Sequence, residues 1–154
     1  MSYRRILVPV DGSRTSNKAL VAALEMARDG GGPVRLLHVI DELALAVGLE
    51  YPGNLLQAAR EQGEHVLSDA MVIVKAAGID GQTHLLDTPG KRLGEAVAEE
   101  AQAWRADLVV VGTHGRRGFS RVLLGSGAES VIRHATIPVL VIHGDEDGAK
   151  PSDR

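Results

Sequence analysis

Residues 108–126 have the sequence LVVVGTHGRRGFSRVLLGS, and the predicted fold depends on this stretch. The unbroken apolar run Leu108-Val109-Val110-Val111 predicts a strand that is buried on both faces. Residues 127–134, directly after the stretch, have the pattern of a short helix. A glycine-rich connection therefore runs from the carboxyl end of a strand to the amino end of a helix. Open α/β sheets bind ligands at such places, where free backbone N–H groups favour anions.

The rest of the chain alternates between strand and helix patterns. Apolar runs predict strands at 6–10, 34–40, 82–86 and 137–142, and the more polar composition of 82–86 suits a sheet edge. Helical spacing predicts helices between Ser13 and Gly30, at 54–77, and from about Pro89-Gly90 to Trp104, whereas 43–53 has no clean period and is expected to be a loop. This alternation predicts an α/β fold: a single doubly wound, Rossmann-like, five-stranded parallel sheet with helices on both faces. We expect one domain at 1–143 and a polar tail at 144–154.

Composition restricts the class of protein. A chain of 154 residues suits one domain, and 44% hydrophobic with only 3% aromatic residues indicates an aliphatic core. The net charge of -3 gives no general attraction to nucleic acid or acidic membranes, so neither is expected as a partner. There is no cysteine, which excludes disulfides and thiolate metal sites and fits a reducing compartment. The first apolar run is too short for a signal peptide or membrane span, so the expected location is the cytoplasm.

Two distant segments are expected to meet at one crevice. In a doubly wound sheet the first and fourth strands lie side by side where the strand order reverses, so Asp11 and the Gly112 loop open onto the same place. The loop has the spacing Gly112, two residues, Gly115, nine residues, Gly125 and then Ser126. Together with VPVDGS at 8–13 and LHVID at 37–41, this spacing resembles the ATP-binding branch of the universal stress protein family over residues 4–142. The resemblance implies an adenosine-nucleotide-α-hydrolase-like architecture.

The resemblance also implies which residues contact ATP. The candidate nucleotide-binding residues are Pro9, Val10, Asp11, Val39, Val111, Gly112, His114, Gly115, Arg116, Gly125, Ser126, Gly127 and Ala128. In the family pattern the backbone around Val39 meets the adenine, and residues 9–11 line the adenosine pocket. Gly112 and Gly115 approach the ribose and phosphates, and residues 125–128 hold the phosphates at the helix start. The divalent metal, Mg²⁺ or Mn²⁺, is carried by the nucleotide.

Two positions depart from the commoner family pattern. Gly127 stands where the family often has valine, and Ala128 stands where some ATP binders have threonine or serine. The first change removes a wall of the pocket, and the second removes a hydroxyl donor. Both changes are expected to affect affinity without abolishing the site.

Several candidates also have purely structural explanations. Ser126 and Glu129 have the spacing of a helix capping box, and Asp11 could cap the first turn of the first helix. Arg116 and Arg117 could contact the γ-phosphate end or only solvate the surface, and His114 could be an ordinary loop residue. The six histidines show no metal-ligand spacing, so no metal site is expected.

Three functions remain open at this level. The favoured hypothesis is an ATP-binding regulatory module with little or no hydrolysis, because no P-loop and no clearly placed general base are present. The alternatives are a slow ATPase or a nucleotide-dependent transferase of the same architecture, and a nucleotide-free dimerisation protein. A homodimer is expected through the last strand, since Val139, Leu140, Val141 and Ile142 are apolar but lie at a sheet edge.

Gly115→Val tests the phosphate-loop hypothesis. A side chain there would occupy the space of the ligand and disfavour a left-handed backbone by ~1–2 kcal/mol. We expect the ATP affinity to fall at least tenfold, or about 1.4 kcal/mol, in calorimetry. The melting temperature without nucleotide should change little, because a surface loop supports few buried contacts. Gly118→Ala, outside the spaced glycines, is the mild control. Unchanged affinity in a folded Gly115→Val variant would show that the loop is only a connector.

Overall fold

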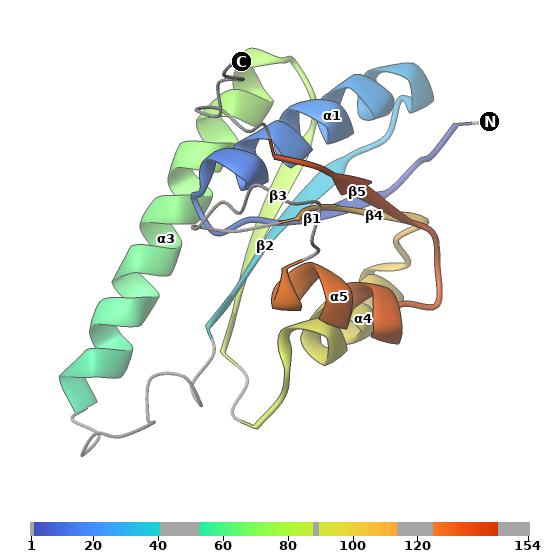
Figure 1. Cartoon of the computed structure of the whole chain (residues 1–154). Coiled ribbons are helices and arrows are strands. Elements are labelled where there is room, and N and C mark those ends of the chain that lie inside the picture. The colour runs from blue at the N-terminus through green and yellow to red at the C-terminus, as the bar shows by residue number, and fades with distance from the viewer. Residues whose placement is uncertain (1, 41–52, 88–89, 114–124, 145–154) are drawn as a thin grey trace, which may run out of the picture.

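The computed structural model describes residues 2–40, 53–87, 90–113 and 125–144 (Figure 1). Its elements follow the order β1 (Ile6–Pro9), α1 (Arg14–Gly30), β2 (Val34–Ile40), α3 (Gly53–Ala76), β3 (Gly81–Asp87), α4 (Leu93–Trp104), β4 (Leu108–Gly112), α5 (Ser126–His134) and β5 (Val139–Ile142). The predicted alternation of strands and helices is confirmed. The loop predicted at 43–53 falls on residues that are mostly outside the described ranges, as does nearly all of the predicted tail.

The five strands form one parallel sheet in the order β3-β2-β1-β4-β5. Strand β1 lies between β2 and β4, with Ile6 opposite Val34 on one side and Leu108 on the other. The strand order reverses at this position, as predicted for a doubly wound sheet. The polar strand β3 is one edge of the sheet and β5 is the other, which confirms both edge assignments.

Helices cover both faces of the sheet (Figure 1). Ile6 and Val8 of β1 pack with α1 and α3, whereas Leu7 between them packs with α4 and α5. All three side chains are fully buried, and each such burial contributes roughly 1.5–3 kcal/mol to folding. Apart from Trp104, the buried hydrophobic residues within the described ranges are aliphatic, as the composition predicts.

Helix α1 begins and ends at residues that the sequence identifies. Ser13 is its N-cap, and the Ser13 hydroxyl accepts a hydrogen bond of 3.1 Å from the Ser16 amide. At the other end Gly31 adopts a left-handed conformation with φ 78°, and its amide binds the Ala27 carbonyl at 2.7 Å.

Two predicted boundaries were wrong. Helix α4 begins at Leu93 and not at Pro89-Gly90, because Gly90 has φ 79°, which no helix accommodates. Arg92 is the N-cap, and its amide binds Glu95 Oε1 at 3.1 Å. Strand β5 begins at Val139 instead of Ile137, since Pro138 has no N–H to give to a strand ladder.

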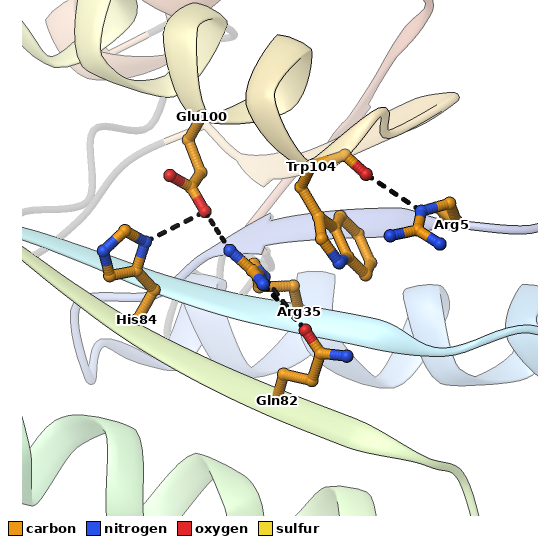
Figure 2. A network of polar contacts seen from close by, with 6 residues as sticks. All are labelled: Arg5, Arg35, Gln82, His84, Glu100 and Trp104. Atoms are coloured by element: carbon orange, nitrogen blue, oxygen red, sulfur yellow. Dashed lines mark hydrogen bonds and ion pairs between the residues drawn. The ribbon is translucent and has the colours of Figure 1, made fainter.

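A network of polar contacts connects β2 and β3 to α4 on one face of the sheet (Figure 2). Glu100 of α4 is buried, and its Oε2 contacts both the Arg35 guanidinium and His84 Nδ1, the latter at 2.9 Å. The guanidinium groups of Arg35 and Arg5 lie 5.1 and 4.7 Å from the ring centroid of Trp104. The buried carboxylate is therefore paired, as a charge in the interior requires.

Helices α4 and α5 make a close contact that only glycine permits. The Gly94 amide donates to Ser130 Oγ at 2.9 Å, and a Cβ built on Gly94 would lie 2.0 Å from the Ser130 carbonyl oxygen. Because that oxygen belongs to a helix backbone, a side chain at position 94 could be accommodated only if the two helices moved apart.

We therefore expect Gly94→Ala to lower the free energy of unfolding by about 2–3 kcal/mol in urea titration. Gly127→Ala is the matched control, since among the described residues its Cβ would meet only a terminal methyl group of Leu93, at 3.0 Å. That control should change stability by less than about 1 kcal/mol. Equal stability of the two variants would contradict the close contact.

Candidate functional site

A cavity of about 450 Å³ opens at the carboxyl ends of the central strands, where the strand order reverses. Its lining combines strand ends with the first turns of α1, α4 and α5. The lining residues are Pro9, Val10, Asp11, Ser13, Ser16, Leu37, His38, Val39, Leu93, Val111, Gly112, Thr113, Gly125, Ser126, Gly127, Ala128 and Val131.

Every described residue of the predicted nucleotide-binding set lines this cavity. These residues are Pro9, Val10, Asp11, Val39, Val111, Gly112, Gly125, Ser126, Gly127 and Ala128. The remaining three, His114, Gly115 and Arg116, lie outside the described residues, as does Arg117. The structure thus brings together segments from three parts of the chain, and their binding of a nucleotide stays a prediction.

Sequence reasoning missed several lining residues. Ser13, Ser16 and His38 line the cavity but are not among the predicted site residues, although Ser13 and His38 lie within the motifs VPVDGS and LHVID. Leu37, Leu93, Thr113 and Val131 also line the cavity without having been predicted. Leu93 lies within the helix predicted from about Pro89-Gly90 to Trp104, and helical spacing does not distinguish a core position from a cavity wall.

A short hydrogen-bonded turn holds Asp11 at the cavity. Asp11 Oδ1 accepts from the Ser13 amide at 2.9 Å, and the Asp11 amide donates to Ser16 Oγ at 3.2 Å. Gly12, with φ 84°, allows the chain to turn between them. The N-cap of α1 is Ser13, so Asp11 supports the cap without being it. The second carboxylate oxygen, Oδ2, has no partner in the described part of the chain.

The amino end of α5 faces the cavity without a side-chain cap. The N-cap is Gly125, Ser126 is the first helical residue, and no side chain bonds the cap position. The first backbone bond of the helix runs from the Glu129 amide to the Gly125 carbonyl at 3.0 Å. The predicted Ser126–Glu129 capping box was therefore wrong, because Ser126 lies one position too far along, and Glu129 pairs with Arg133 at 3.0 Å.

Two glycines that line the cavity differ in what a side chain at their position would contact. A Cβ on Gly112 would lie 2.5 Å from Thr15 Cγ2 and 2.9 Å from the Thr15 carbonyl oxygen, so glycine is needed there to pack β4 against α1. On Gly127 a Cβ would approach, among the described residues, only Leu93 Cδ2, at 3.0 Å. Gly127 therefore widens the cavity, whereas Gly112 is required by the fold as well as by any ligand.

Thr113 and Gly125 bring the two ends of the glycine-rich stretch together. The Gly125 amide donates to the Thr113 carbonyl at 2.7 Å, and the Thr113 amide donates to the Ile142 carbonyl at 3.0 Å. The buried Thr113 hydroxyl accepts from the Gly144 amide at 3.3 Å. Thr113 and Gly125 are thus held next to each other beside the cavity, and Thr113 is bonded to β5.

The described lining is apolar on its strand side and carries little charge. Asp11 and His38 are its ionisable side chains, and neither lysine nor arginine lines the cavity within residues 2–40, 53–87, 90–113 and 125–144. Over the same ranges, no three His, Cys, Asp or Glu side chains gather as metal ligands. Anion-binding capacity in this part of the site comes from the backbone N–H groups of α5.

Comparison with known proteins agrees with this geometry. The model of the universal stress protein family matches residues 2–143. The chain belongs to the universal stress protein family. A curated relative, universal stress protein MJ0531 of Methanocaldococcus jannaschii, is 35% identical over 143 residues, covering 91% of this chain and 82% of the relative.

Solved structures of the family share the fold. A universal stress protein family member from Burkholderia pseudomallei is 35% identical with a TM-score of 0.73, over 91% of this chain and 96% of that one. The universal stress protein from Archaeoglobus fulgidus, solved in complex with dAMP, is 29% identical with a TM-score of 0.67, over 92% and 99% of the two chains.

The described helices lack the properties of a membrane span. None of them combines the length and the apolar character that crossing a bilayer requires.

Proposed function

We propose that this chain is an ATP-binding regulatory module of the stress response, with little or no hydrolysis. The observation that carries the proposal is one cavity that joins an apolar slot to the uncapped amino end of α5. An adenine base needs the first feature, and a phosphate group needs the second. The dAMP complex of the Archaeoglobus relative supports an adenine nucleotide as the ligand.

The dimensions and polar groups of the cavity support this ligand. Its volume of about 450 Å³ suits a small molecule, and Val39, Leu93 and Val131 supply apolar wall. The unpaired Oδ2 of Asp11 is available, among the described residues, to accept from a ribose hydroxyl. Ser126 and the next two residues offer N–H groups to phosphate oxygens.

Charge balance supports a metal-bound nucleotide. A triphosphate brings several negative charges to a described lining that contains a carboxylate and no lysine or arginine. A divalent cation carried by the nucleotide, Mg²⁺ or Mn²⁺, would neutralise part of this charge, and Arg116 and Arg117 of the sequence could supply more. The described lining provides no metal cluster of its own, so the proposal places the metal on the nucleotide.

The same lining favours binding over catalysis. A phosphoryl-transfer site needs a group that positions the attacking water or abstracts its proton. Asp11 accepts from the Ser13 amide and His38 Nδ1 contacts the Val10 carbonyl, so both ionisable groups of the described lining already have structural roles. We further propose that the module works in the cytoplasm, as one domain over residues 1–143.

Calorimetry with ATP and MgCl₂ tests the function. We expect saturable binding of one ATP per chain at millimolar ligand or below, with weaker binding when the metal is chelated. ATP turnover should stay far below ~10 s⁻¹, a typical enzyme value. Absence of binding at millimolar ATP would refute the binding proposal, and turnover near the typical enzyme value would favour the ATPase alternative.

We also propose a homodimer formed through β5. This strand is paired with β4 on one side only, from Val109 opposite Val139 to Gly112 opposite Ile142. Its apolar side chains are all only half-buried, although they pack against both core layers. An edge strand of this kind offers backbone hydrogen bonds and apolar surface to a second copy.

Light scattering should therefore give twice the chain mass of 16.3 kDa at micromolar concentration. Val141→Lys should shift the protein toward monomer, because a charge on an edge strand opposes pairing. Thr83→Lys on the opposite edge strand, β3, is the control and should leave the dimer intact. A monomeric wild-type protein, or a dimer lost only in Thr83→Lys, would contradict the β5 interface.

A further inference from the structure

Strand pairing ends abruptly where the chain enters the cavity. The ladder between β1 and β2 runs from Ile6 opposite Val34 to Pro9 opposite Leu37. One more backbone bond follows, from the Val10 amide to the Leu37 carbonyl at 2.8 Å. Beyond that point the backbone of Val10 and Asp11 leaves the sheet and becomes cavity wall.

The next hydrogen bond between these two segments is made by a histidine side chain. His38 Nδ1 lies 2.8 Å from the carbonyl oxygen of Val10, so a side chain of β2 continues the pairing that the two backbones have ended. A carbonyl oxygen only accepts hydrogen bonds, so Nδ1 must carry the proton. The neutral ring is then the Nδ1–H tautomer, with Nε2 as the bare nitrogen.

The long helix α3 leaves room for this ring. A Cβ on Gly63 would lie 2.7 Å from His38 Cδ2 and 2.7 Å from Leu85 Cδ1. A glycine inside a helix costs ~1 kcal/mol relative to alanine, so its presence there needs a reason. The space it leaves lets the imidazole lie between the sheet and α3 with Nδ1 directed at Val10.

We propose that His38 is a positioning residue of the candidate nucleotide site. Its Nδ1–H fixes the Val10 carbonyl, and through it the turn that presents Asp11 to the cavity. Among the described residues, local hydrogen bonds join Asp11, Ser13 and Ser16 within that turn, and Thr15 lies close to Gly112 of β4. The His38 side chain adds a hydrogen bond from β2 to the Val10 carbonyl, at the residue where the turn begins. The role in ligand affinity rests on the proposed function, whereas the role in holding the turn does not.

Three substitutions at this position separate the hydrogen bond from the bulk of the ring. His38→Asn keeps an N–H donor at the place of Nδ1, His38→Gln moves the donor to the place of Nε2, and His38→Leu removes it. His65→Leu, on the exposed face of α3, is the matched control for loss of an imidazole elsewhere. Thermal melting of each variant establishes whether it is folded. If the leucine variant is unfolded, the comparison between the glutamine and asparagine variants decides the test.

The first measurement needs no nucleotide. Nitrogen NMR of the wild-type ring should show the Nδ1–H tautomer. Amide exchange at Asp11 and Ser13 should rise at least about tenfold in the Leu and Gln variants, because an unpaired buried carbonyl favours local opening. Asparagine should restore most of the protection, and Val109 in the central sheet should be unaffected throughout. An Nε2–H tautomer, or equal exchange in all variants, would overturn the proposal.

The second measurement is calorimetric titration with Mg-ATP. The dissociation constant should increase at least about tenfold in His38→Leu and His38→Gln, and only a few-fold in His38→Asn. An equal loss in all three would assign His38 a packing role and overturn the proposal. If the wild-type protein binds no ATP, the proposed function fails, and the exchange measurement alone decides whether His38 holds the turn.

Discussion

Parallel pairing on both sides of β1 is the constraint on which the rest of the structure depends. The strand stops at Pro9, whereas its neighbour β2 continues to Ile40 and β4 continues to Gly112. A short strand between two longer ones leaves a recess at its end, and parallel topology directs the following helix starts toward the same edge. The cavity thus follows from strand length and direction, before any side chain is considered.

The pattern of the sequence was sufficient for the fold because the fold depends on periodicity. The run Leu108–Val111 is buried on both faces, and Ser13 and Gly31 carry the end signals of α1 in their own chemistry. The described part of the site could be predicted for a related reason. Asp11 lies between the end of β1 and the start of α1, and Gly125 is the N-cap of α5, so topology alone brings them together.

Features that depend on distant contacts could not be predicted. In the sequence, Gly63 is only a residue that destabilises a helix. The side chain that requires glycine there, the ring of His38, belongs to β2. The sequence predicts that Gly112 is needed for the approach of a ligand, whereas the close packing of Thr15 of α1 already requires glycine at this position. The capping box at Ser126 failed because the helix begins one residue earlier, and such a shift has no sequence signature when the cap is a glycine.

The hydrogen bond between Thr113 and Gly125 also bears on how this protein could change during evolution. Because Thr113 and Gly125 are hydrogen-bonded to each other and Thr113 is bonded to β5, the span that residues 114–124 must bridge is fixed by described residues. Doubling the length of a closed loop costs only about 0.6 kcal/mol of entropy. Insertions between these two residues should therefore cost the fold little free energy, and paralogues could acquire different ligands or partners there while inheriting the same scaffold.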